Sequence, residues 1–174
     1  IDSSGRLLLG TTTEGYASAD DLTVATTGST GITIRSGTGS LGTIAYSDGT
    51  SGDAEYRGYF QYDHNGDFLK IGTAGAEKVR ITSGGQVRVG NTDITTASAA
   101  DDLIVGPNTP AGDHGITIFS GTSGTGNIYF ADTDTASYGN RMGTISYYHN
   151  GNYMRFSTSG NKEALRLGER GNMT

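Results

Sequence analysis

The sequence repeats itself at an interval of 80 to 86 residues, and this repeat limits the available folds more than any other feature. Residues 1–10 (IDSSGRLLLG) match residues 81–90 (ITSGGQVRVG). Further matches join 17–24 to 97–105, 31–38 to 115–122, 62–67 to 147–152 and 77–81 to 163–167. Such a chain is typical of a linear array, because each repeat packs mainly against its neighbours. The sequence therefore predicts a first unit (1–80), a second unit (81–166) and the start of a third, truncated unit (167–174).

The repeat begins part-way through a predicted hairpin. Residues 78–82 and 86–89 alternate apolar and polar side chains around a Ser-Gly-Gly turn. Residues 1–9 match the second strand of this hairpin, and residues 163–167 match the first. We therefore expect the chain to continue head to tail, into further repeats or into another copy. Pairing of residues 1–9 wholly within their own unit, with a closed and compact end, would contradict this.

Large apolar side chains are scarce. Leu, Ile, Val and Phe supply 31 of 174 residues, whereas Gly, Thr and Ser number 29, 25 and 16. The share of Leu, Ile, Val and Phe lies below the roughly 20% at which disorder is suspected. A net charge of only -6 and ten tyrosines argue against disorder. The composition therefore excludes an enzyme-sized core, and we expect other chains to supply the missing stability.

Charge, apolar runs and cysteine content exclude several partners. The 12 Lys and Arg residues are scattered singly in an acidic chain, so we expect no nucleic-acid partner. No apolar run approaches the ~18 residues of a membrane-spanning helix, so we expect no membrane insertion. The absence of Cys excludes a disulfide framework and a thiolate metal site.

The local pattern predicts short strands throughout. Ile32 and Ile34 alternate with polar residues, and Asn-Gly pairs at 65–66 and 150–151 are strong hairpin signals. The predicted fold class is all-β: an elongated, repeat-built fibre of short strands and hairpins, formed by an intertwined or side-by-side homotrimer.

The same alternation assigns two faces to each predicted sheet. The side chains expected to face inward are Phe60, Tyr62, Leu69 and Ile71, matched by Ile145, Tyr147, Met154 and Phe156. Those expected to face outward are Tyr59, Gln61 and Lys70, matched by Thr144, Ser146 and Arg155. So few inward side chains barely offset the backbone entropy of one unit, whereas three sheets around a shared axis would use each apolar stripe twice.

His64 and His149 occupy equivalent positions just before the Asn-Gly turns. In a trimer, three copies of either residue could converge on an axial metal ion. The alternative is a polar residue flanking a turn. We favour that alternative, so no metal or other cofactor is assigned.

Two patterns suggest catalysis or cofactor binding without supporting it. Residues 37–42 read GTGSLG, but a dinucleotide site needs a helix next, and a predicted strand follows. Four carboxylates cluster in the first unit: Asp53, Glu55, Asp63 and Asp67. The second unit has Tyr148 and Asn152 in place of the last two. We therefore predict no catalytic residue and no enzyme activity.

Aromatic residues on the predicted outward face are candidates for glycan contact, because such rings can stack on sugars. They are Tyr59, Phe68, Tyr148 and Tyr153. The alternative, which we favour, is that the same residues anchor an interface between chains.

The repeat motifs resemble those of a known family. Residues 1–12 (IDSSGRLLLGTT) followed by ADDLTV at 19–24 are similar to the "GxVGIGTTSP…LxV" repeat of bacteriophage tail fibres. Residues 31–37 (GITIRSG), 44–52 (IAYSDGTSG) and 77–85 (EKVRITSGG) resemble repeats in marine phage and cyanophage fibre proteins. The resemblance implies a homotrimeric extracellular virion appendage, often upstream of a receptor-binding tip or a self-cleaving chaperone domain.

The expected function is that of a structural shaft segment in a phage tail fibre that supports host attachment. The expected partners are identical chains. Two alternatives remain open: a carbohydrate-binding receptor module that contacts host surface glycans, and a microbial extracellular surface fibril.

Overall fold

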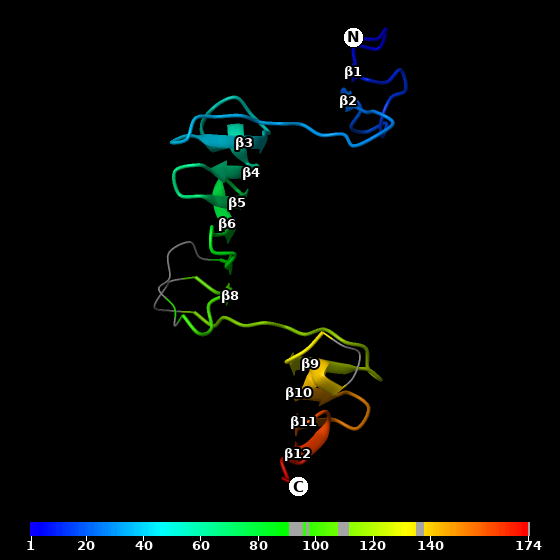
Figure 1. Ribbon diagram of the computed structural model, residues 1–174, viewed down its shortest axis with the longest axis vertical. Helices are drawn as coiled ribbons and strands as arrows, with labels where there is room; N and C mark the ends of the chain where they lie inside the picture. The colour runs from blue at the N-terminus through cyan, green and yellow to red at the C-terminus, as the bar shows by residue number, and fades with distance from the viewer. Residues whose placement is uncertain (91–95, 97, 108–111, 135–137, 174) are drawn as a thin grey trace. The chain divides into compact units, whose positions relative to one another are not determined.

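The computed structural model describes all residues except 91–95, 97, 108–111, 135–137 and 174 (Figure 1). Within the described residues the protein is all-β, as predicted, and its only helices are short 3-10 turns at Gly52–Tyr56 (η1) and Tyr138–Arg141 (η2). The strands are β1 (Leu7–Leu9), β2 (Leu22–Val24), β3 (Leu41–Tyr46), β4 (Gly58–Asp63), β5 (Phe68–Thr73), β6 (Ala76–Ile81), β7 (Val87–Val89), β8 (Leu103–Val105), β9 (Thr125–Phe130), β10 (Gly143–Tyr148), β11 (Tyr153–Thr158) and β12 (Lys162–Leu167). Residue 97, where one repeat match begins, lies outside the described residues.

The chain divides into two compact units, Ile1–Asp113 and His114–Thr174. The first holds the parallel pair β1–β2 and a six-stranded sheet in the order β3-β4-β5-β6-β7-β8. The second holds a four-stranded sheet in the order β12-β11-β10-β9. The sequence boundary between residues 80 and 81 falls within β6, inside the six-stranded sheet.

Two antiparallel meanders, β3–β6 and β9–β12, have the same register. The residues that lie opposite one another are Ile44, Phe60, Ile71 and Val79 in the first meander, and Ile128, Ile145, Phe156 and Leu165 in the second. The register shifts at the same place in both, just after Ile71 and just after Phe156. The matching sequences of the two meanders thus form the same strand pairing in both.

One turn occurs three times with the same hydrogen bonds. In each copy a residue donates its N–H to the carbonyl four residues later at 2.9–3.0 Å, and the residue three positions later donates back at 2.9–3.1 Å. The three copies join Asp2 to Arg6 and Gly5, Thr82 to Gln86 and Gly85, and Gly168 to Asn172 and Gly171. The glycine φ angles are 85°, 85° and 73°, in the left-handed region where a side chain would be strained.

β1 and β7 differ in how many partners they have. β7 pairs with β6 on one edge and with β8 on the other. β1 pairs in parallel with β2, and no strand in the described part of the chain occupies its other edge.

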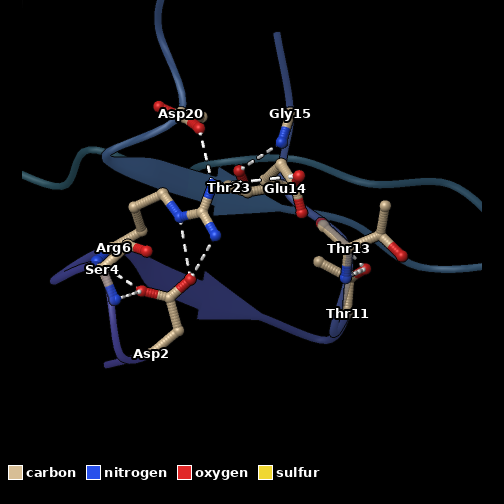
Figure 2. A network of polar contacts seen from close by, with 9 residues as sticks. All are labelled: Asp2, Ser4, Arg6, Thr11, Thr13, Glu14, Gly15, Asp20 and Thr23. Atoms are coloured by element: carbon tan, nitrogen blue, oxygen red, sulfur yellow. Dashed lines mark hydrogen bonds and ion pairs between the residues drawn. The ribbon is translucent and has the colours of Figure 1, made fainter. Parts of the chain in front are cut away.

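Arg6 ties β1 to the segment that leads into β2. Its guanidinium donates to Asp2 from Nε at 2.8 Å and to Asp20 from Nη1 at 2.9 Å (Figure 2). The hydrogen bonds from Arg6 lower the pKa of Asp2. Gln86 holds the equivalent position before β7 and donates to Asp101, so the same connection is made there without the guanidinium.

Candidate functional site

Each of the two larger sheets has one apolar face, and no side chain of that face is fully buried. On the six-stranded sheet it consists of Ile44, Phe60, Tyr62, Leu69, Ile71, Val79, Ile81, Val87, Val89, Leu103 and Val105. On the four-stranded sheet it consists of Ile128, Phe130, Ile145, Tyr147, Met154, Phe156, Leu165 and Leu167. Ile44 is 49% exposed and Phe130 is 58% exposed, and the one buried hydrophobic residue of the described chain, Ile104, lies on the opposite face. A contiguous exposed apolar face of this kind marks a contact surface.

A segment of chain lies on one side of each apolar face. A hollow of 340 Å³ in the first unit is bounded by Ile32 and Ile34 together with strand residues that include Ile44 and Phe60. Ile34 comes so close to β3 that a Cβ added to Gly42 would lie 3.7 Å from its Cγ2. In the second unit, Ile118 and Gly126 repeat this approach at 3.4 Å. The alternation at Ile32 and Ile34 predicts a strand there, but residues 31–36 and the matching residues 115–120 join no ladder in the described chain.

The face predicted to point outward is the more covered of the two. The alternation correctly identified which residues share it, but the expectation that Thr144 and Ser146 face solvent is wrong, because they are only 4% and 2% exposed. Ser146 lies between the longer side chains of Asn127 and Arg155 on neighbouring strands. Its hydroxyl is 2.8 Å from Asn127 Oδ1, so the small residue is covered and bonded in place.

Cations and an aromatic ring cover this polar face in the first unit. Lys70 Nζ lies 4.9 Å from the centre of the Phe68 ring, and Arg80 Cζ lies 4.0 Å from it. Lys70 also donates to Asp63 at 3.1 Å, and this bond lowers the pKa of the carboxyl. Arg80 donates to both oxygens of Glu77, at 2.7 and 2.9 Å. The cations are thus held by rings and carboxylates of their own chain.

The second unit covers the same face with two tyrosines. The rings of Tyr148 and Tyr153 stack with centres 4.6 Å apart and planes 10° apart. Arg155 lies over the first ring at 4.8 Å and Arg166 over the second at 4.2 Å. Arg166 also donates to Glu163, and this bond lowers the pKa of the Glu163 carboxyl.

The four residues predicted to contact glycan are partly buried and already packed against their own chain. Three are the stacked rings just described: Phe68, Tyr148 and Tyr153. The ring of the fourth, Tyr59, covers Gly72, where an added Cβ would lie 2.1 Å from it. The structure brings Tyr148 and Tyr153 together, but Phe68 lies opposite Asp63 and Tyr59 lies opposite Gly72. Glycan contact by these rings therefore stays a prediction.

The two histidines considered as metal ligands have equivalent surroundings. His64 contacts the Tyr62 ring edge-on at 5.0 Å and 72°, and His149 contacts Tyr147 at 5.0 Å and 78°. Their backbone amides donate to Ser40 and Gly124. Each imidazole thus packs beside a tyrosine of the apolar face. Metal binding between copies stays a prediction.

Three of the four clustered carboxylates of the first unit have structural partners. Asp63 pairs with Lys70, while Asp67 and Asp53 each accept a tyrosine hydroxyl, from Tyr62 and Tyr56, at 3.0 Å. Among the described residues, no group of three or more His, Cys, Asp or Glu side chains is placed to hold a metal ion. No helix in the described chain has the length and apolar character to cross a membrane.

Alternation alone does not predict the pairing of Glu77 with Arg80 or of Glu163 with Arg166. Residues three apart on a regular strand point to opposite faces. The register shift in each meander inserts one extra residue, Lys78 in the first, which returns Glu77 and Arg80 to the same face. The spacing E-x-x-R occurs in both units and was the available signal.

No family model, no curated protein and no solved structure matches this chain.

Proposed function

We propose that the chain is a structural shaft segment of a phage tail fibre that supports host attachment. In this proposal it is extracellular, part of the virion, free of catalytic residues and continued head to tail. Its partners are two further copies of itself, which bury the apolar faces of its sheets around a shared axis.

The observation that carries this proposal is the uncovered apolar face of each sheet. Each strand of the six-stranded and four-stranded sheets contributes large apolar residues, at alternate positions, to one side of its sheet. Burying one such side chain contributes roughly 1.5–3 kcal/mol. A single chain lacks most of this stabilisation, whereas copies that pack their apolar faces together obtain it. Because the copies bind only the folded state, the association stabilises that state.

The opposite face supports the same assignment because it needs no partner. Its cations stack on rings and pair with carboxylates of the same chain, as at Lys70 and Arg166. Such a face suits the outside of a fibre. The phage assignment itself is supported by the motif resemblance; a microbial surface fibril would use the same physics, and the genes that flank this one would distinguish the two.

The test is the mass in solution, with variants that place one charge on either face of the same strand. Wild type should sediment at three times the 18.0 kDa of one chain. The double variant Ile44→Asp/Ile128→Asp should sediment as a monomer, because it puts charges into the contact surface. Ala45→Asp is the matched control: Ala45 neighbours Ile44, is also exposed and lies on the other face. A wild-type monomer at micromolar concentration would contradict the proposal.

The stacked pair Tyr148–Tyr153 favours the second candidate, a carbohydrate-binding receptor module. Paired rings beside the turn that joins two central strands can hold a sugar. A glycan array distinguishes the candidates: a plain shaft binds none, while a receptor module binds a defined glycan and loses it in Tyr153→Ala.

A further inference from the structure

Two short segments of the chain have strand-like sequence but no strand partner. We call residues 31–36 (GITIRS) the first arm and residues 115–120 (GITIFS) the second arm. Neither arm makes a backbone hydrogen bond to another described residue. Their apolar side chains are exposed, with Ile32 at 68%, Ile116 at 69% and Phe119 at 94%. A segment with alternating apolar and polar residues and free backbone N–H and C=O groups is able to pair as a strand.

Each arm precedes an edge strand that is also open. β3 pairs only with β4, and β9 pairs only with β10, so each keeps one row of backbone groups free in the described chain. The arms and these strands are all six residues long. The chain therefore carries one arm for each of these two open edges.

The arm does not fill the edge beside it. The turn at residues 37–40 leads directly from the first arm into β3. Instead of lying in the plane of the sheet, the arm crosses its apolar face, where Ile34 approaches Gly42. The second arm repeats this placement at Gly126. Ser36 and Ser120, at the equivalent ends of the arms, have buried hydroxyls with no hydrogen-bond partner among the described residues.

We infer that each arm adds as a strand to the open edge of β3 or β9 in a neighbouring copy of the chain. An arm that lies on its own apolar face would then directly extend its neighbour's sheet. Ile32 and Ile34 would point into the shared interior, and Arg35 would join the neighbour's polar face. Giving one arm and receiving another is a heterologous contact, which closes into a ring around the fibre axis and pairs the open edges of β3 and β9. This inference rests on the proposed self-association.

Hydrogen exchange tests the backbone pairing. In the assembled protein, alternate amides within residues 32–35 and 116–119, those that face the neighbour's edge, should exchange at least about 100-fold more slowly than in an unstructured peptide. The amides of β4 are the internal reference, because they are bonded within each chain. A wild-type monomer would overturn both this inference and the proposed function. A trimer in which the arm amides exchange freely would overturn this inference alone.

Engineered disulfides test the partner edge, and the absence of native Cys keeps the result clean. Arg35→Cys is combined in turn with Leu41→Cys, Thr43→Cys and Ala45→Cys, which cover β3 on the face that Arg35 would join. At least one pair should give oxidised, covalently closed trimers on a denaturing gel. Arg35→Cys with Ile44→Cys is the matched control and should give none, because Ile44 points to the other face. Absence of interchain bonds from all three pairs would overturn β3 as the partner edge.

Discussion

The meanders β3–β6 and β9–β12 share a backbone but fill their polar faces differently. Where the first pairs Asp63 with Lys70, the second stacks Tyr148 on Tyr153. Where the first places Tyr59 over Gly72, the second has Thr144 beside Ser157. The apolar faces, by contrast, keep large apolar side chains at matching positions.

The difference shows which requirement each face meets. The polar face accepts an ion pair or an aromatic stack, provided that the same space is filled and each cation has a partner. The apolar face keeps large apolar residues at matching positions in both meanders, as expected if it packs against the same kind of apolar surface in both. The following substitutions challenge this comparison.

The largest effect is expected from Gly72→Ser, which gives the first meander the residue of the second. The new Cβ would lie 2.1 Å from the Tyr59 ring, so the ring must move, and we expect a loss of about 2–3 kcal/mol in the free energy of unfolding. The double variant Gly72→Ser/Tyr59→Thr copies both residues of the second meander and should recover most of it. Urea unfolding measures all three proteins.

Gly84→Ser is the control, because an added Cβ there meets nothing closer than 3.9 Å. If the double variant is no more stable than Gly72→Ser alone, the two positions do not compensate each other, and the comparison fails there.

A smaller effect is expected at the stacked pair. Tyr148→Ala removes the contacts with Tyr153 and Arg155 and should cost about 1–2 kcal/mol. Tyr148→Asp copies Asp63 and should cost less, because Arg155 stands where Lys70 stands and can pair with the new carboxylate. Thermal unfolding ranks the variants. A greater loss for Tyr148→Asp than for Tyr148→Ala would show that the two pairings are not interchangeable.

The histidines should behave alike in the two meanders. His64→Ala and His149→Ala each remove one edge-on contact with a tyrosine, and each should cost about 0.5–1 kcal/mol. Calorimetry with and without Zn²⁺ separates this role from metal binding. A Zn²⁺-dependent rise in Tm that disappears in either variant would instead establish the axial metal site.

The smallest effect is the pH dependence that the Asp63–Lys70 ion pair adds to the first meander. The folded chain lowers the pKa of Asp63 from its ordinary value of 3.8, so the pair stabilises fully above that value and is lost as pH falls through the folded pKa. Asp63→Asn should therefore be less stable than wild type at neutral pH, and the gap should close in acid. Asp113→Asn, at an exposed loop residue, should show no such closing gap. If the stability difference between Asp63→Asn and wild type does not change with pH, the Asp63–Lys70 pair is not the source of the pH dependence.

Much of the fold could be predicted from the sequence because its signals are local. Alternation placed Phe60 with Tyr62 on one face and Lys70 on the other, and the Gly-rich turn between residues 82 and 86 placed the β6–β7 hairpin. Less of the candidate site could be predicted from the sequence. The register shift that brings Glu77 to Arg80 depends on how β5 and β6 pair, and the E-x-x-R spacing indicates the pairing without specifying the shift.

The sequence by itself determined that this protein is all-β, where its turns lie and which residues share a face. These properties follow from two-residue periodicity and from glycines that adopt positive φ, so they need only neighbouring residues. The tertiary structure alone decided which face is covered and which segments find partners. Arginine and tyrosine side chains reach across strands to cover the polar face, while residues 31–36 and 115–120 lie on the apolar face with their backbones unpaired. Both outcomes depend on which strands become neighbours, and that is settled only when the sheets assemble.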